Sequence, residues 1–279
     1  MTPDDARLDA DELEREYSPS SRVGGTSAPF VDDYIARSAA ARAALGDRVE
    51  EAVDGTLTMA GHPDRPVLVF IHGGYWQALS AEHSLYLAPG ALAHDWSYVA
   101  VEYTIAPPGT VEQMVDECRR AVVAAVARLR DRGHHGPVVL AGHSAGAHLA
   151  AMATLVHDQP SAPVADIRRV VLLSGVFDLR PIVHTTVNDP LHLTTLRAEA
   201  LSPVLHPASA DDQSPDVIVA WGDNDTSAFA RQSRTYAHIL HQAAHPVTAI
   251  EVAQRHHFDI VDDIVDPTTE LGKLVADGL

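Results

Sequence analysis

The segment Gly142-His143-Ser144-Ala145-Gly146 combines a hydroxyl group with two flanking glycines. It follows an apolar run at 138–141 and precedes a stretch rich in Ala and Leu, which favours a strand, a sharp turn and a helix. Glycine is needed on both sides of such a turn because a side chain there would strike neighbouring backbone. The helix N-terminus also favours negative charge at this point. The pattern therefore predicts that Ser144 is a nucleophile.

A second pair of glycines follows the apolar run 67–71, in the segment His72-Gly73-Gly74-Tyr75-Trp76. Glycines at such a turn allow backbone N–H groups to point into a cavity, where they stabilise the negative charge that develops on an attacked carbonyl oxygen. Each such donor is typically worth about 3 kcal/mol. We therefore expect the N–H groups of Gly73 and Gly74, together with that of Ala145, to form an oxyanion hole.

A serine hydroxyl becomes reactive only when a base takes its proton and a third group, commonly a carboxylate, orients that base. In chains with a G-x-S-x-G turn the acid and then the histidine follow the serine, on loops after late strands. The apolar run 217–220 leads into the segment 221–225, and the last apolar run leads into 255–259. The residues alone leave two candidates for each role: Asp223 or Asp225 as the acid, and His256 or His257 as the base.

Other chemistry has less support in the sequence. Adjacent histidines point apart in an extended chain, and neither an H-E-x-x-H run nor a pair of cysteines supplies further metal ligands, so we expect no metal and no cofactor. Most of the 17 histidines have no motif around them, and we interpret His72 and His143 as packing or hydrogen-bonding residues that shape their loops. The single cysteine, Cys118, excludes an internal disulfide and is expected to be a buried, inert thiol.

The segments that would position these residues are typical of a parallel sheet covered by helices on both faces. β-Branched apolar runs recur along the chain and are nearly continuous rather than alternating, which predicts an α/β fold. Apolar residues at helical spacing from Val115 to Leu129 predict an amphipathic crossover helix. We expect a further helix at 229–243, a late strand at 247–252 and the start of a closing helix at 259–265. The predicted central strands are 67–71, 98–101, 138–141, 170–173 and 217–220.

The chain has 279 residues, of which 46% are hydrophobic and 21% are charged, as in a globular domain with a large core. We expect one domain over residues 1–279. Two regions fall outside the predicted sheet: 9–45, which holds short helical patterns, and 175–215, which is rich in Pro, His and Thr. The second region lies between two strands and would sit above their carboxyl ends, where ligands of open α/β sheets bind, so we predict that it is a lid.

The formal net charge is −18, and no cluster of Lys and Arg rises above it, which argues against nucleic acid and anionic membranes as partners. Residues 1–16 are acidic and polar where a secretory signal needs a basic start and an apolar stretch, so we expect a cytoplasmic protein. His143, Ser144 and His148 interrupt the apolar segment 137–156, which therefore predicts a buried strand and helix rather than a membrane span.

Several further segments, spread over nearly the whole chain, match a known family. The most specific are Trp76 directly after Tyr75, the stretch Asp178-Leu179-Arg180-Pro181, and Arg231-Gln232-Ser233. The others are 14–19, 103–107, 142–148, 174–182, Thr185, Asn188, Leu191, 202–203, 229–233 and 257–259. Together these residues resemble the kynurenine formamidase (arylformamidase) family of α/β-hydrolases. The His-Gly-Gly and G-x-S-x-G patterns alone are shared with hormone-sensitive-lipase-like esterases.

The resemblance implies a catalytic triad of Ser144, Asp225 and His257, because the family's acid lies four residues before a Phe and its histidine precedes Phe-Asp. It also implies hydrolysis of N-formyl-L-kynurenine to kynurenine and formate, as in tryptophan degradation. We expect Tyr75 and Trp76 to contribute to an aromatic substrate pocket. The chain departs from the family at residues 226–228, where members often have Ser-Pro-Glu and this chain has Thr-Ser-Ala.

Two other functions are compatible with the motifs. A carboxylesterase acting on short acyl or aryl esters needs the same triad and differs only in substrate. A non-catalytic protein of the same fold would bind a small ligand or a partner. We expect a small-molecule substrate as the partner of the enzyme, and the sequence leaves a homodimer open.

Overall fold

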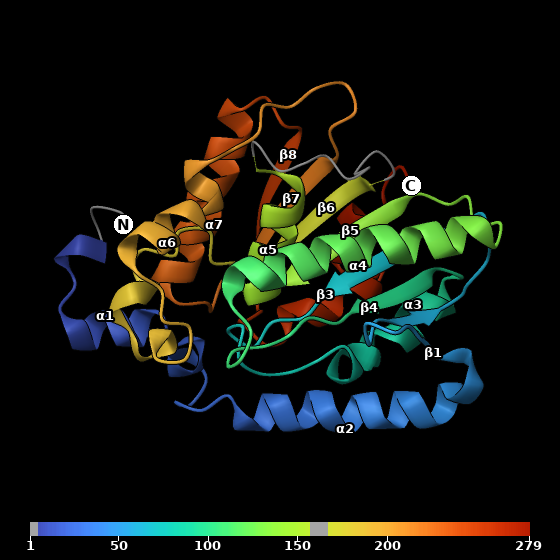
Figure 1. Ribbon diagram of the computed structural model, residues 1–279, viewed down its shortest axis with the longest axis horizontal. Helices are drawn as coiled ribbons and strands as arrows, with labels where there is room; N and C mark the ends of the chain where they lie inside the picture. The colour runs from blue at the N-terminus through green and yellow to red at the C-terminus, as the bar shows by residue number, and fades with distance from the viewer. Residues whose placement is uncertain (1–4, 157–166) are drawn as a thin grey trace.

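The computed structural model describes residues 5–156 and 167–279 (Figure 1). In this part of the chain eight strands form one sheet, in the spatial order β1-β2-β4-β3-β5-β6-β7-β8. Strands β3 to β8 run parallel, whereas β1 and β2 are antiparallel additions at one edge. The strands are β1 (Glu50–Glu51), β2 (Leu57–Met59), β3 (Val67–Ile71), β4 (Ser97–Val101), β5 (Val138–His143), β6 (Ile167–Leu173), β7 (Asp216–Gly222) and β8 (Val247–Val252).

The central strands are continuously apolar because both faces of the sheet are covered. In β3 the alternate residues Val69 and Ile71 pack into one hydrophobic cluster, while Leu68 and Phe70 pack into the other. Every residue of β3, β4 and β5 is buried. β3 and β5 are direct neighbours, and Ile71 pairs with Gly142, so the loops that follow these two strands emerge side by side.

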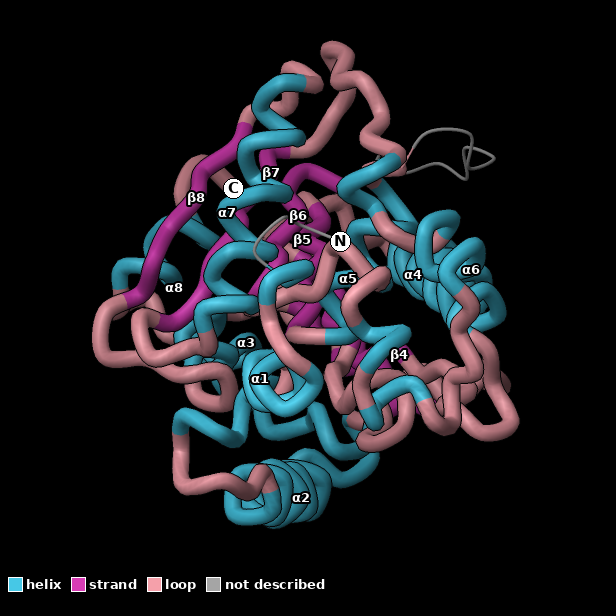
Figure 2. The backbone as a smooth tube through the Cα atoms, turned by 90° about the vertical axis from the view of Figure 1, so that its left-hand side faces the viewer, coloured by secondary structure: helices cyan, strands magenta, loops and turns pink. Residues whose placement is uncertain are grey.

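Two sets of helices cover the sheet. One face packs against α4 (Val111–Asp131), α5 (Ala145–Thr154) and α7 (Ser227–Gln242), and the other packs against α2 (Ala28–Leu45), α3 (Ala88–Ala93) and α8 (Glu270–Ala276). Figure 2 shows α4 and α8 on opposite sides of the sheet. The shorter elements are α1 (Ala10–Glu16), η1 (Asp5–Arg7), η2 (Pro19–Arg22), η3 (Gly46–Arg48), η4 (Glu82–Leu87), η6 (Ile182–His184), η7 (Thr186–Asn188), α6 (Thr195–Ala200), η8 (Pro203–Leu205) and η9 (Ile260–Val265).

The α/β fold predicted from the apolar runs is confirmed. The predicted strands 67–71 and 247–252 coincide with β3 and β8, and the other four lie inside β4 to β7. The crossover helix is α4, and the helix predicted at 229–243 is α7. The predicted closing helix at 259–265 is instead the 3₁₀ segment η9, and the α-helix α8 follows it only after Pro267, because proline disfavours helical backbone in the residue before it.

The N-terminal region 9–45 is attached to the rest of the molecule at both of its ends. The hydroxyl of Thr226 donates a 2.6 Å hydrogen bond to the carbonyl of Glu16, which docks α1 against the start of α7. On the other face, the Tyr34 ring of α2 stacks on Tyr86, with ring centroids 4.8 Å apart. The segment between these anchors therefore crosses the end of the sheet at which the β3 and β5 loops emerge.

The region 175–215 holds η6, η7, α6 and η8. Its first residues are packed into the core, since Phe177 and Leu179 are fully buried. None of the helices within residues 5–156 and 167–279 combines the length and the apolar character that crossing a lipid bilayer requires.

Candidate active site

Ser144 lies at a strained turn between β5 and α5. Its backbone angles are φ 56° and ψ −117°, in a region that residues with side chains rarely adopt. The flanking glycines permit the turn because the chain is crowded there. A Cβ at Gly142 would lie 2.2 Å from the carbonyl oxygen of Gly146, and a Cβ at Gly146 would lie 2.0 Å from that of Ile71. The turn raises the serine side chain into a cavity at the carboxyl end of the sheet.

Asp225 and His257 form a buried pair beside that cavity. Nδ1 of His257 lies 3.0 Å from Oδ1 of Asp225, and both side chains are almost completely shielded from solvent. The other carboxylate oxygen accepts hydrogen bonds from the Ser174 hydroxyl, at 2.6 Å, and from the Gly222 N–H. Burial by itself would raise the pKa of Asp225, but the charge of His257 and these hydrogen bonds outweigh it, so the pKa lies below its ordinary value.

The structure separates the candidates that the residues alone left open. Asp223 is exposed, and its carboxylate accepts a hydrogen bond from the Gln254 N–H. His256 packs edge-on against the Phe30 ring, and its Nδ1 accepts from the Phe258 N–H. Neither is part of the buried pair, so the arrangement favours Asp225 over Asp223 and His257 over His256.

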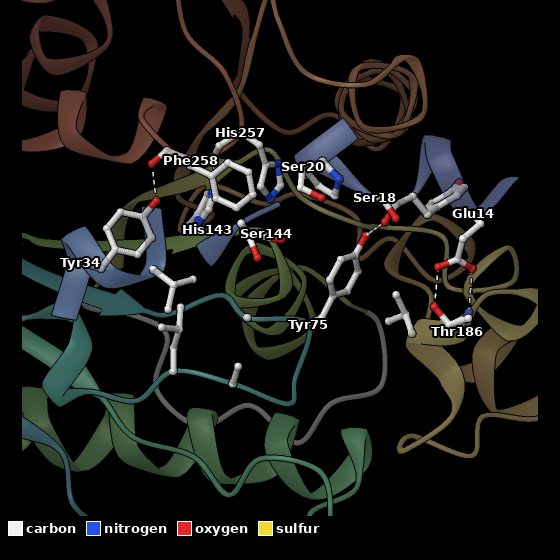
Figure 3. Close-up of a pocket in the computed structure, with 18 residues that line it drawn as sticks. Glu14, Ser18, Ser20, Tyr34, Tyr75, His143, Ser144, Thr186, His257 and Phe258 are labelled. Carbon is white, nitrogen blue, oxygen red and sulfur yellow. Dashed lines mark hydrogen bonds between the residues drawn. The ribbon is translucent and has the colours of Figure 1, made fainter. Parts of the chain in front are cut away.

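Ser144 and His257 line the same cavity (Figure 3). Among the described residues, no hydrogen bond joins the Ser144 hydroxyl to the His257 ring. Catalytic hydrogen bonds of this type are often long without substrate and tighten when it binds. The three candidate side chains are therefore gathered at one place, although the described residues show no hydrogen bond between Ser144 and His257.

A hydrogen bond from the His143 ring supports the same pair. Its Nε2 lies 2.7 Å from the carbonyl oxygen of His257, which can only accept, so Nε2 carries the proton and Nδ1 has a lone pair. Burial, followed by the charge of His257, lowers the pKa of His143 to about 3. The ring is therefore neutral at physiological pH and acts as a hydrogen-bonding residue, as interpreted from the sequence.

The loop after β3 is oriented by Tyr103. The Tyr103 hydroxyl is 3.0 Å from the carbonyl oxygen of His72 and 3.3 Å from that of Gly73, and its ring stacks on His72 with centroids 4.2 Å apart. Because these peptide bonds are trans, carbonyls held toward Tyr103 direct the N–H groups of Gly73 and Gly74 the opposite way. In the sequence, only the family resemblance of segment 103–107 points to Tyr103.

The expected oxyanion donors are available for a ligand. Within residues 5–156 and 167–279, the N–H groups of Gly73, Gly74 and Ala145 have no hydrogen-bond acceptor in the protein. Gly74 lines the cavity with φ 98°, and a Cβ there would lie 2.2 Å from the Ala78 carbonyl oxygen, so only glycine fits. Gly73 is packed against the serine turn, where a Cβ would lie 3.2 Å from that of Ser144.

The cavity has a volume of about 310 Å³, and the N-terminal region supplies much of its wall. Sequence reasoning predicted the region 175–215 as the cover, but that region contributes only Thr186 and Val187 to the lining. Tyr17, Pro19 and Tyr34 were the available signal for the contribution of the N-terminal region. The lining residues are Glu14, Tyr17, Ser18, Pro19, Ser20, Ser27, Val31, Tyr34, Gly74, Tyr75, Ala78, Leu79, His143, Ser144, Thr186, Val187, His257 and Phe258.

The structure places Tyr75, but not Trp76, at the cavity, which corrects the expectation for Trp76. Tyr75 lines the cavity and its hydroxyl donates to the carbonyl of Tyr17. Trp76 is completely buried, and its indole N–H donates to Nδ1 of His148, 3.3 Å away. Both residues have positive φ angles, and the Trp76 ring packs in the hydrophobic core with its centroid 5.9 Å from that of Tyr75.

Other reactive groups lie away from these residues. Cys118 is buried in α4, and burial raises the pKa of its thiol well above the ordinary value. Within the described ranges, no three side chains of His, Cys, Asp or Glu gather in an arrangement that would hold a metal ion.

Comparison with known proteins assigns the family. Residues 68–259 match the family described as alpha/beta hydrolase fold. The chain is 36% identical to kynurenine formamidase of Danio rerio and 33% identical to that of Salmo salar, in each case over 96% of both chains. A solved structure from Silicibacter sp. tm1040, provisionally described as a thioesterase, superposes with a TM-score of 0.81 at 27% identity, over 95% of this chain and 98% of the other. The chain is a hydrolase and belongs to the kynurenine formamidase family of the α/β-hydrolase fold.

Proposed function

We propose that the protein hydrolyses the formamide of N-formyl-L-kynurenine, or of a related aryl formamide, to the free amine and formate. The observation that carries the proposal is the buried Asp225–His257 pair beside the strained Ser144 turn, within one cavity. The full-length similarity to proteins named kynurenine formamidase supports the substrate. The aromatic rings of Tyr34, Tyr75 and Phe258 in the lining suit an aryl group.

In the first half of the reaction, His257 accepts the Ser144 proton while the serine oxygen attacks the formyl carbon. The carbonyl oxygen becomes an oxyanion, which the N–H groups of Gly73, Gly74 and Ala145, without an acceptor among the described residues, would bind. The C–N bond then breaks, and the protonated His257 gives its proton to the departing aryl amine. The product of this half is a formyl ester of Ser144.

In the second half, His257 takes a proton from water as the water oxygen attacks the formyl ester. The second oxyanion collapses, formic acid leaves and ionises to formate in water, and His257 returns its proton to the Ser144 oxygen, so that the enzyme is regenerated. Asp225 keeps Nδ1 of His257 protonated through the 3.0 Å contact and stabilises the imidazolium in both halves. The lowered pKa of Asp225 keeps it ionised for this task.

A carboxylesterase is the second candidate, because the similarity to a structure provisionally described as a thioesterase favours ester or thioester substrates. A panel of N-formyl-L-kynurenine, p-nitrophenyl esters and a thioester decides between the two through kcat/KM. We expect the formamide to exceed the esters by about tenfold or more, which corresponds to about 1.4 kcal/mol of transition-state binding. Efficient turnover of the esters alone would overturn the formamidase proposal.

A non-catalytic role is the third candidate and is tested separately. We expect a fluorophosphonate probe to label the protein at Ser144 and not to label the Ser144→Ala variant. Absence of labelling in the wild-type protein would support a binding function instead.

We also propose that the protein works in the cytoplasm, on a small-molecule substrate. The support is a single buried cysteine and a formal net charge of −18, which disfavours anionic membranes. Fractionation of the native cells with an antibody tests the location, and recovery in a secreted or membrane fraction would contradict it.

A further inference from the structure

The cavity has two chemically different ends, with Ser144 between them (Figure 3). Tyr34 and Phe258 lie at one end, where the Tyr34 hydroxyl is already used by the Phe258 carbonyl. Glu14 and Thr186 lie at the opposite end. A ligand held at Ser144 therefore meets an aromatic surface on one side and a carboxylate on the other.

The end of the cavity at Glu14 carries negative charge only. Glu14 is the only Asp or Glu among the lining residues, which all lie in the described part of the chain, and the lining contains no Lys or Arg. Arg22 and Arg180 lie outside the lining, where the Arg22 guanidinium donates to Asn224 and that of Arg180 to Asp178. A ligand anion in this cavity would lose water without meeting a cation, whereas a ligand cation would meet Glu14.

The Glu14 carboxylate is held in place before any ligand arrives. One oxygen accepts from the Thr186 N–H at 2.8 Å, and the other accepts from the Thr186 hydroxyl. A carboxylate offers about four acceptor positions, so these two bonds leave capacity on both oxygens. Ser18 lies in the same lining, and its hydroxyl has no hydrogen-bond partner among residues 5–156 and 167–279. An ammonium group has three N–H donors, and the Glu14 carboxylate and the Ser18 hydroxyl offer acceptors for them.

We propose that Glu14 is the subsite for a substrate ammonium group, so that the enzyme selects aryl formamides whose side chain carries a cationic amine. The inference rests on the proposed function and extends it to substrate class. No cation in the lining is available for a substrate carboxylate, so the carboxylate of an amino-acid substrate contributes little to binding. An amine that has lost its carboxylate is therefore as good a substrate as the amino acid itself.

Four aryl formamides with one ring system test the inference: N-formyl-L-kynurenine, its decarboxylated amine, its deaminated acid, and 2-formamidoacetophenone, which has neither group. We expect the two amines to have KM values about tenfold lower than the two compounds without an amine, since a hydrogen bond to a charged group is worth about 1.5–3 kcal/mol. We expect kcat to be similar for all four because the reacting group is unchanged.

The Glu14→Gln variant should raise KM about tenfold for the two amines, with kcat nearly unchanged, and leave the other two substrates unaffected. Glutamine retains an acceptor for the Thr186 N–H, so the loop contact is kept. The matched control is Glu16→Gln, which removes the same charge from the same helix outside the cavity. Glu16 accepts from the Ala228 N–H, a bond that glutamine also makes. This control should keep the wild-type preference for amines.

The outcomes distinguish a failure of the ammonium subsite from a failure of the formamidase function. If the wild-type enzyme hydrolyses the deaminated acid with the same KM as the amines, the ammonium subsite is wrong and the formamidase function stands. If none of the four formamides is hydrolysed and esters are, the proposed function itself has failed. If Glu14→Gln does not fold, the wild-type series of four substrates still decides the inference. Equal KM changes in the Glu14→Gln and Glu16→Gln variants would also overturn it, because the effect would then be long-range charge.

Discussion

The ring of His143 donates a 2.7 Å hydrogen bond to the backbone carbonyl of His257. One residue of the serine turn thus holds the loop that carries the candidate base, although 114 residues separate the two in sequence. The pKa of His143 is lowered to about 3, mainly by burial, so the ring stays neutral and Nε2 remains a donor at every pH at which such an enzyme works.

Replacing His143 with Ala leaves the buried His257 carbonyl without its donor. We expect a loss of about 1–3 kcal/mol in the free energy of unfolding, measured by urea denaturation. We also expect kcat/KM to fall by about tenfold or more, because the base is no longer held in position.

His148→Ala is the matched control. His148 is also buried and neutral, with a pKa lowered to about 4 mainly by burial, and it contacts the Leu201 carbonyl at 2.8 Å, outside the cavity lining. It should lose similar stability with a smaller loss of kcat/KM. Equal losses of kcat/KM in both variants would mean that the His143 bond has no special role in positioning His257.

Ser174→Ala tests the support of the candidate acid. The hydroxyl of Ser174 donates to Asp225 at 2.6 Å, and its removal leaves one carboxylate oxygen with only the Gly222 N–H. We expect kcat/KM to fall by about tenfold, since a hydrogen bond to a charged group is worth about 1.5–3 kcal/mol. The control is Ser233→Ala, because the Ser233 hydroxyl is buried without a hydrogen-bond partner in the described part of the chain. That variant should keep full activity, and a comparable loss in it would refute the assignment.

The sequence was sufficient for the sheet and for the serine turn, because each depends on local patterns. β3 and β5 are short apolar runs followed by glycines, and a parallel sheet brings their ends together. β1 and β2 escaped prediction since they are two and three residues long, too short for a periodic pattern.

The wall of the cavity was not predictable in the same way. Residues 14–34 reach the site only through tertiary contacts, such as the Thr226 hydroxyl on the Glu16 carbonyl, which no local pattern encodes. Trp76 was placed wrongly because adjacency to Tyr75 suggested a shared role, whereas the Trp76 ring is completely buried and only Tyr75 of the two lines the cavity. Local periodicity thus predicts helices and strands, whereas the direction of a side chain at a strained turn can be determined only from the structure.

The acid stability of the protein should depend on Asp225. Its pKa in the folded state is lower than the ordinary value, so the unfolded state binds the proton more tightly. The carboxylate therefore stabilises the fold fully above the ordinary pKa of Asp, about 3.9, and this contribution disappears as the pH falls through the lower folded pKa.

Urea denaturation of the wild-type protein and of Asp225→Asn, from neutral pH down to pH about 3, measures this contribution. We expect a shallower loss of stability on acidification in the variant, together with a fall in kcat of about 10³–10⁴-fold at neutral pH. Parallel pH curves for the two proteins would contradict the lowered pKa.

Tyr103→Phe tests whether the oxyanion donors need to be oriented from behind. Phenylalanine keeps the ring stacked on His72 but removes the hydroxyl that holds the carbonyls of His72 and Gly73. Those carbonyls are then free to turn, and the N–H groups of Gly73 and Gly74 turn with them, because each peptide is planar. The oxyanion exists only after attack, so the loss should appear in kcat, by about tenfold, with KM nearly unchanged. A rise in KM at constant kcat would instead place Tyr103 in ground-state binding, since substrate and transition state would then have lost the same contact.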